Sequence, residues 1–181
     1  TATDASGNVR TAAQTVTVSD TEPPSLIAPA NVSVSTSPGT CEATNVVLGQ
    51  PVTSDNSALL RIPKDAPTVF PKGETVVTWT VTDTSGNLNT ATQTVTVTDA
   101  ELPTITAPAH VFTSTDVGTC DAANVVLGQP VTSDNCGVAS VANDAPTVFP
   151  KGEPLVTWTV TDTSGNRNTA LQTVTVTDTE L

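Results

Sequence analysis

The sequence predicts an all-β protein made of tandem β-sandwich domains, each with about seven short strands. Three observations lead to this prediction. Threonine alternates with valine over long stretches, a pattern typical of pleated strands and unfavourable for helices. Hydrophobic residues make up 36% of the 181 residues but aromatic residues only 3%, so each core must be small and rich in β-branched side chains. The third observation is an internal repeat.

The repeat has a period of 79 residues and aligns without a gap. Cys41 falls on Cys120, Trp79 falls on Trp158, and about 55 of the 79 paired positions are identical. Residues 1–20 match the end of each copy. We therefore expect a piece of a longer array, divided into a C-terminal hairpin of a preceding repeat at 1–20, full repeats at 21–99 and 100–178, and the start of the next linker at 179–181.

The strands of one repeat can be assigned in the last copy. Leu155–Thr161 and Thr169–Thr177 alternate between apolar and polar residues, and the short loop 162–166 between them predicts a β-hairpin. Trp158 lies at the centre of this hairpin and can anchor a small core. Gly and Pro interrupt the earlier apolar runs, which predicts shorter strands there. We expect these at 105–115 (interrupted at Pro108), 123–127, 138–141 and 147–149.

Charge and residue content exclude several classes of function. The formal net charge is −12, which repels nucleic acid and anionic membrane surfaces. No apolar run is long enough to span a bilayer. The only histidine is His110, and Asn31 replaces it in the other copy, so the two copies cannot share a nucleophile–histidine site. The sequence predicts no nucleic-acid partner, no membrane insertion and no enzyme.

Motifs of the last copy resemble the hyalin-repeat (HYR) domain, an immunoglobulin-like extracellular module. The resemblance lies in Asp134-Asn135-Cys136-Gly137, Phe149-Pro150-Lys151-Gly152, residues 157–166 and residues 177–180. Ser57 departs from the pattern, because the family has a cysteine there. The resemblance covers essentially the whole chain and implies tandem immunoglobulin-like β-sandwich domains in a secreted or cell-surface protein used for adhesion or spacing. The near-identity of the copies is similar to that of bacterial surface adhesins and filaments.

Acidic residues from three separate segments are expected to meet at each junction between repeats. In an immunoglobulin-like sandwich, the second-to-third and sixth-to-seventh strand loops lie at the same end as the N-terminus. Clustered carboxylate and carbonyl oxygens suit Ca²⁺. Plain turn capping by Asp and Asn is the alternative interpretation. The candidate ligands are Asp99, Glu101, Asp134, Asn135, Asp162 and Asn166, and in the preceding copy Asp20, Glu22, Asp55, Asn56, Asp83 and Asn87.

The three cysteines lead us to expect one disulfide, between Cys120 and Cys136 of the same repeat. Cys41 then has no partner, because Ser57 stands at the matching position. A straight chain between Cys120 and Cys136 would place them too far apart, so this bridge requires the chain to fold back near Gly128. If the chain runs straight, both thiols are free.

These features predict a structural or adhesive stalk, a spacer or filament segment of a large extracellular repeat protein. Proline in the linkers 20–24 and 99–103 stiffens the joints, and calcium would stiffen them further. The expected partners are neighbouring repeats, other copies in a fibre, or a surface glycan or protein. The alternatives are a glycan- or protein-binding module, or an accessory array of a secreted hydrolase.

Overall fold

The computed structural model of the chain describes residues 1–180 and contains only strands, turns and irregular segments. The described part has no helix that is long and apolar enough to cross a membrane. Contacts divide the chain into two compact units. The first holds Thr1–Pro29, Gln50–Asp65 and Thr78–Thr92, and the second holds Ala30–Gly49, Ala66–Val77 and the chain from Gln93 onward.

The first unit begins with a small hairpin of β1 (Ala2–Thr3) and β2 (Val9–Arg10), which pair in antiparallel fashion. The side chain of Asp4 closes its turn by accepting the backbone N–H groups of Ser6 and Asn8, each at 2.9 Å. The short strands in the rest of this unit form two antiparallel pairings. These are β3 (Ser25–Ile27) with β6 (Val52–Ser54), and β7 (Leu59–Arg61) with the end of β9 (Gly73–Asp83).

The second unit contains the rest of the repeat 21–99 and the whole repeat 100–178. In the former, β4 (Val32–Ser35) pairs in parallel with the end of β10 (Leu88–Thr98), and β5 (Glu42–Thr44) pairs with β8 (Val69–Pro71). The latter has eight strands: β11 (Thr104–Thr106), β12 (Val111–Ser114), β13 (Asp121–Ala123), β14 (Val131–Ser133), β15 (Val138–Asn143), β16 (Val148–Pro150), β17 (Leu155–Asp162) and β18 (Arg167–Thr177).

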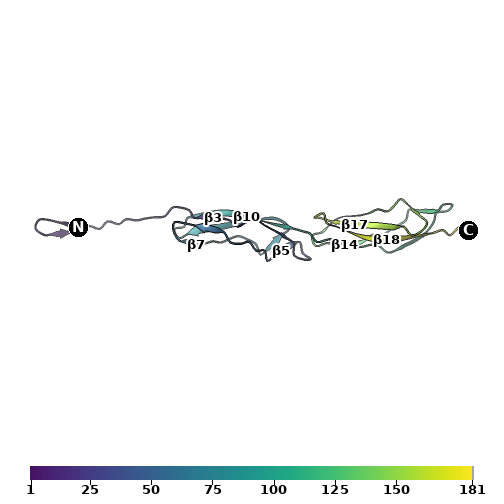
Figure 1. Cartoon of the computed structure of the whole chain (residues 1–181), viewed down its shortest axis with the longest axis horizontal. Coiled ribbons are helices and arrows are strands. Elements are labelled where there is room, and N and C mark those ends of the chain that lie inside the picture. The colour runs from purple at the N-terminus through teal and green to yellow at the C-terminus, as the bar shows by residue number, and fades with distance from the viewer. Residues whose placement is uncertain (181) are drawn as a thin grey trace. The chain divides into compact units, whose positions relative to one another are not determined.

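The strands of the last repeat form a β-sandwich (Figure 1). One sheet has the order β12-β18-β17-β15, in which β12 runs parallel to β18 and the other pairs are antiparallel. The pairs β11–β14 and β13–β16 complete the repeat. The prediction of an all-β protein made of tandem immunoglobulin-like β-sandwiches is confirmed.

The short strands differ from the predicted ones in three places. The segment 105–115 is two strands in different sheets, because Pro108 interrupts the chain between β11 and β12. Only the first residue of 123–127 is in a strand, the last of β13. The sequence analysis missed β14, which follows Gly128 (φ 83°) and Pro130 and contains only three residues.

The core follows from the alternation along β17 and β18. Val156, Trp158, Val174 and Val176 are buried against Phe149 and neighbouring apolar residues. Gln172 is also buried, with 2% of its surface exposed. Its amide donates to the carbonyls of Ala109 (2.8 Å) and Leu127 (2.7 Å), and its Oε1 accepts from the Trp158 indole N–H at 2.9 Å. These bonds tie two irregular segments to the sheet and leave the buried amide fully partnered.

Candidate metal centre at the repeat junction

Three carboxylates of the second unit meet where the repeat 100–178 begins. Asp99 follows β10, Asp134 follows β14, and Asp162 is the last residue of β17. One oxygen of each lies within 4.8 Å of the other two. Asp99 and Asp162 are buried, with 8% and 2% of their surfaces exposed, and Asp134 is half-buried. We call Asp99, Asp134 and Asp162 the junction cluster.

Each carboxylate of the junction cluster caps its own turn. Asp162 Oδ1 accepts the backbone N–H groups of Ser164 and Asn166, both at 2.8 Å. Asp134 Oδ2 accepts from Cys136 N–H at 2.8 Å, and Asp99 Oδ1 accepts from Glu101 N–H at 3.1 Å. Short polar side chains favour this local geometry whatever lies nearby. Turn capping by aspartate, the alternative to a calcium site, is therefore present. Asp99 and Asp134 each use one carboxylate oxygen to cap their turns.

Two buried oxygens at the junction cluster have no hydrogen-bond partner in the described part of the chain. They are Asp134 Oδ1 and Asn135 Oδ1. Buried polar atoms without a partner are rare in native proteins, and each one requires a physical explanation such as an ion. Both atoms are hard oxygen donors beside two further carboxylates, the donor type that Ca²⁺ prefers. The residues present therefore fit a calcium ion.

The protonation state of Asp162 also suits a cation. Burial raises the pKa of this carboxyl, but hydrogen bonds from the Asn166 side chain and from the backbone of Ser164 and Asn166 outweigh burial and hold the pKa below its ordinary value. Asp162 is therefore ionised at neutral pH. The junction cluster therefore carries a negative charge at neutral pH.

The first unit contains the same arrangement, formed by Asp20, Asp55 and Asp83, which we call the N-terminal cluster. One oxygen of each again lies within 4.8 Å of the others. Asp20 Oδ2 and Asp55 Oδ1 are buried and have no hydrogen-bond partner among the residues that the structure describes. The hydrogen bond from the backbone N–H of Glu22 lowers the pKa of Asp20, so this carboxyl is also ionised at neutral pH.

Other candidate ligands donate hydrogen bonds to the clusters and to the linkers, and they do not belong to the two groups of three aspartates. Asn166 donates to Asp162 Oδ2 (2.8 Å) and to the carbonyls of Asp99 and Glu101 (3.2 Å each). Asn87 donates in the same way to Asp83 Oδ2 (2.8 Å) and to the Asp20 carbonyl (3.3 Å).

The two predicted glutamates accept hydrogen bonds through their side chains. Glu101 accepts the backbone N–H of Gly39 at 2.9 Å. Glu22 accepts the side-chain amide of Asn56 at 2.9 Å. Each glutamate therefore holds a linker in place beside its cluster.

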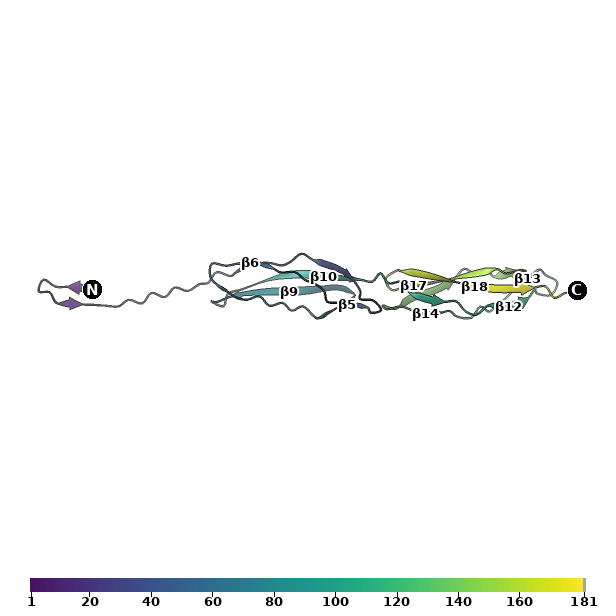
Figure 2. The same ribbon diagram turned by 60° about the horizontal axis from the view of Figure 1, so that its bottom comes forward.

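The expected Cys120–Cys136 disulfide is wrong, because Cys136 is bonded to Cys41 of the preceding repeat. The chain does not fold back near Gly128. It runs from β13, which pairs with β16, to β14, which pairs with β11, and these strands lie toward opposite ends of the repeat (Figure 2). Cys120 is consequently a free, exposed thiol. The bridge spans 95 residues and joins two repeats beside the junction cluster.

Two further junction contacts were missed by the sequence analysis. Asn135 donates to the Thr40 carbonyl at 2.8 Å and to Thr36 Oγ1 at 3.5 Å, across to the preceding repeat. Lys72 donates to the hydroxyls of Thr163 and Ser164. These residues lie in turns, and their partners are reached only across a junction, so spacing within one repeat carries no signal for them.

Comparison with known proteins identifies one family. A model of the HYR domain matches residues 19–97 and 98–176. The hyalins of Lytechinus variegatus and Strongylocentrotus purpuratus are 35% and 34% identical to this chain over 96% of its length. The chain covers 35% of the first hyalin and 15% of the second. A Rattus norvegicus protein, "Sushi, von Willebrand factor type A, EGF and pentraxin domain-containing protein 1", is 32% identical over 91% of the chain and 5% of its own length.

Solved structures give a more distant similarity. The Drosophila N-cadherin EC1–4 structure covers 88% of this chain and 50% of its own, with 10% identity and a TM-score of 0.48. The protocadherin gammaB7 EC3–6 structure covers 85% of this chain and 50% of its own, with 15% identity and a TM-score of 0.36.

Proposed function

The chain belongs to the HYR domain family, and from this premise we propose that it is a spacer and adhesive segment of an extracellular repeat protein whose junctions bind Ca²⁺. The family relationship supports an extracellular or cell-surface location and an adhesion-type module. None of the relatives named above carries the name of an enzyme. The chain spans about a third or less of their length, so the partners of the whole protein belong to this proposal. A bacterial source stays a prediction.

The unpartnered oxygens of the junction cluster carry the calcium proposal. Asp99, Asp134 and Asp162, with Asn135 Oδ1, would hold the ion, which supplies positive charge among three close carboxylates. Ca²⁺ takes six to eight oxygen ligands in flexible geometry, whereas Mg²⁺ demands a near-ideal octahedron. An irregular set of turn oxygens therefore favours Ca²⁺. The N-terminal cluster repeats this donor set, as expected for a site that belongs to every junction.

The contacts of the linker support a spacer role. Asn166 and Asn168 donate to the carbonyls of Asp99, Glu101 and Pro103, so the linker is attached to the repeat that follows it. Gly39 N–H donates to Glu101, which attaches the same linker to the repeat that precedes it. A linker held from both sides resists bending, and an ion bound by Asp99 and the two loops would add a further constraint.

Thermal unfolding with Ca²⁺ and then with a chelator tests this function. A site filled at about 100 times its dissociation constant adds about 2.7 kcal/mol to the free energy of unfolding, which for a small domain raises the midpoint by roughly 10 °C or more. Asp134→Asn should reduce this rise, because it removes a charge while an amide oxygen can still accept from Cys136 N–H.

The matched control is Asp144→Asn, which alters an Asp that also accepts a backbone N–H, from Thr157, outside both clusters. This variant should keep the full response to Ca²⁺. A midpoint that Ca²⁺ does not move in the unmodified chain would sink the calcium proposal. A glycan- or protein-binding module, the alternative function, would instead retrieve a specific ligand from a broad panel in a pull-down.

A further inference from the structure

Cys120 occupies the same position as Cys41, which is already bonded to the next repeat. The two cysteines follow turns of the same form, in which Thr40 N–H donates to Ser37 O and Thr119 N–H donates to Asp116 O, both at 3.0 Å. Lys72 N–H donates to the Cys41 carbonyl at 3.1 Å, and Lys151 N–H donates to the Cys120 carbonyl at 3.0 Å. The backbone that presents Cys41 to its partner is therefore already formed around Cys120.

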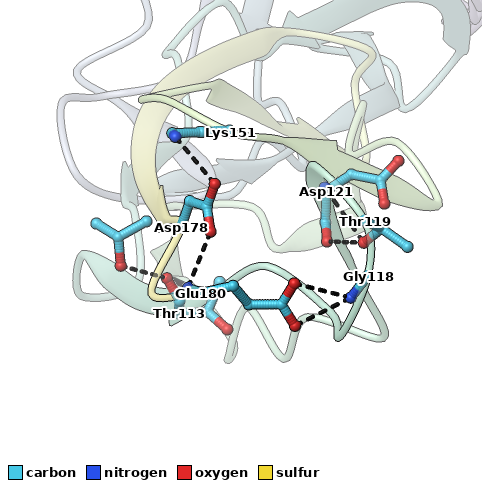
Figure 3. A network of polar contacts seen from close by, with 8 residues as sticks. Thr113, Gly118, Thr119, Asp121, Lys151, Asp178 and Glu180 are labelled. Atoms are coloured by element: carbon cyan, nitrogen blue, oxygen red, sulfur yellow. Dashed lines mark hydrogen bonds and ion pairs between the residues drawn. The ribbon is translucent and has the colours of Figure 1, made fainter.

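The linker after the last repeat is placed as in the completed junction. Glu180 accepts the backbone N–H of Gly118 at 3.0 Å (Figure 3). In the completed junction, Glu101 accepts the backbone N–H of Gly39 at 2.9 Å. The capping bond from Glu180 N–H to Asp178 is 3.1 Å long, the same as its counterpart at Asp99. The chain thus leaves this repeat along the path that leads, one repeat earlier, into a following domain.

Two side chains of the last repeat differ in their partners from the matching side chains at the completed junction. Thr36 Oγ1 accepts from Asn135, whereas its counterpart Thr115 Oγ1 is buried and has no partner among residues 1–180. Lys72 reaches hydroxyls of the following repeat, whereas its counterpart Lys151 lies 3.2 Å from Asp178 (Figure 3). An Asn-Cys loop would supply both the missing amide for Thr115 and the missing thiol for Cys120.

From this correspondence we infer that the Cys120 end of the repeat 100–178 is a docking surface for another HYR repeat with an Asp-Asn-Cys-Gly loop, and that Cys120 forms a disulfide with that cysteine. A repeat of the Ser57 type would dock without the bond. Two thiols become one disulfide by losing two protons and two electrons, which a disulfide oxidant such as glutathione disulfide accepts through a mixed-disulfide intermediate. The inference does not depend on a bound cation.

An extended chain tests this inference. A further copy of residues 103–178 is joined directly after Leu181, which corresponds to Leu102, so the added repeat keeps the natural register. The protein is folded with glutathione disulfide in the presence of a chelator, its free thiols are alkylated, and its disulfides are mapped by mass spectrometry without reduction. We expect Cys120 to be bonded to the added copy's counterpart of Cys136, and alkylation of Cys120 to fall to the level of Cys41.

The matched control carries serine at that added cysteine, as the chain itself does at position 57. There Cys120 should be alkylated fully while the Cys41–Cys136 bond remains. The inference is overturned if Cys120 stays alkylated in the extended chain whose Cys41–Cys136 bond is intact, or if Cys120 bonds to Cys120 of another molecule. Because no calcium is involved, this outcome is separate from that of the proposed junction ion.

Discussion

The N-terminal cluster and the junction cluster have the same carboxylates but different surroundings. In both clusters, each aspartate accepts the backbone N–H of the residue two positions after it. In the junction cluster, Asn135 is half-buried and donates to Thr40 of the preceding repeat. In the N-terminal cluster, the matching Asn56 is exposed and donates to Glu22 of its own linker. Turn capping is therefore a property of the local sequence, whereas the partner of the asparagine differs between the two clusters.

The second difference is covalent. Cys136 ties the loop of the junction cluster to the preceding repeat, whereas the matching Ser57 donates its hydroxyl to Asp55 at 2.6 Å. The serine hydroxyl thus donates to the aspartate of its own repeat, and Ser57 has no sulfur with which to form a disulfide. One substitution separates a junction that is locked by a disulfide from one that relies on weaker contacts.

The largest effect should follow from removing this lock. In the chain-entropy model, a bridge that closes a loop of about 100 residues stabilises the folded chain by up to about 4.7 kcal/mol. The double variant Cys41→Ser/Cys136→Ser should lower the free energy of unfolding by a large part of that amount. Urea unfolding measures it, and Cys120→Ser is the control that should change nothing. Equal losses in the two variants would show that the bond does not stabilise the junction.

A smaller effect should distinguish the clusters as ion sites. We expect the junction cluster to bind Ca²⁺ about tenfold more tightly, equivalent to about 1.4 kcal/mol. Its asparagine is already held by Thr40 and its loop by the disulfide, so less ordering accompanies binding. Calorimetric titration should resolve two sites, with Asp134→Asn removing the tighter and Asp55→Asn the weaker. The reverse assignment would contradict this role of the preceding repeat.

Sequence patterns predicted local structure and the convergence of Asp99, Asp134 and Asp162, but they missed the disulfide between repeats. Alternation predicted the hairpin of β17 and β18 and the burial of Trp158, because period-two patterns report one strand's two faces. The disulfide was misassigned because Cys120 and Cys136 are close in sequence, although β13 and β14 lie toward opposite ends of the repeat. A signal was nevertheless present, since an odd cysteine count with Ser57 at one site fits pairing between successive repeats.

Polar residues with long-range partners were the other omission. Gln172 looks like one more polar residue in an alternating strand, yet it is buried and holds two carbonyls. A lysine in a Pro-Lys-Gly turn usually faces solvent, and Lys151 does, but Lys72 is half-buried against the following repeat. The partners of these side chains are fixed by tertiary packing, which periodicity in the sequence does not encode.

This pair of lysines provides a matched test of the non-covalent contacts. Lys72→Ala removes two hydrogen bonds across the junction and should lower the free energy of unfolding by about 1 kcal/mol. Lys151→Ala removes only an exposed ion pair with Asp178, and we expect a loss under about 0.5 kcal/mol. Urea unfolding of both variants in the oxidised chain makes the measurement. Indistinguishable losses would mean that the contact of Lys72 contributes nothing beyond an ordinary surface pair.

The smallest effect concerns acid, and it again compares the clusters. The pKa of Asp162 in the junction cluster and that of Asp20 in the N-terminal cluster lie below the ordinary value of 3.8. The folded state therefore binds fewer protons than the unfolded state. The stabilisation is fully present above about pH 4 and is lost as the pH falls through the folded-state pKa.

Acid unfolding is followed by tryptophan fluorescence with a chelator present, in chains that keep either Trp158 or Trp79 and have Phe in place of the other. Asp162→Asn should flatten the acid dependence reported by Trp158. Asp20→Asn should flatten the acid dependence reported by Trp79. If each aspartate stabilises only its own cluster, neither substitution should alter the acid dependence reported from the other repeat. A change in both reporters after one substitution would instead mean that the two repeats unfold together, and the locked junction would then be the element that couples them.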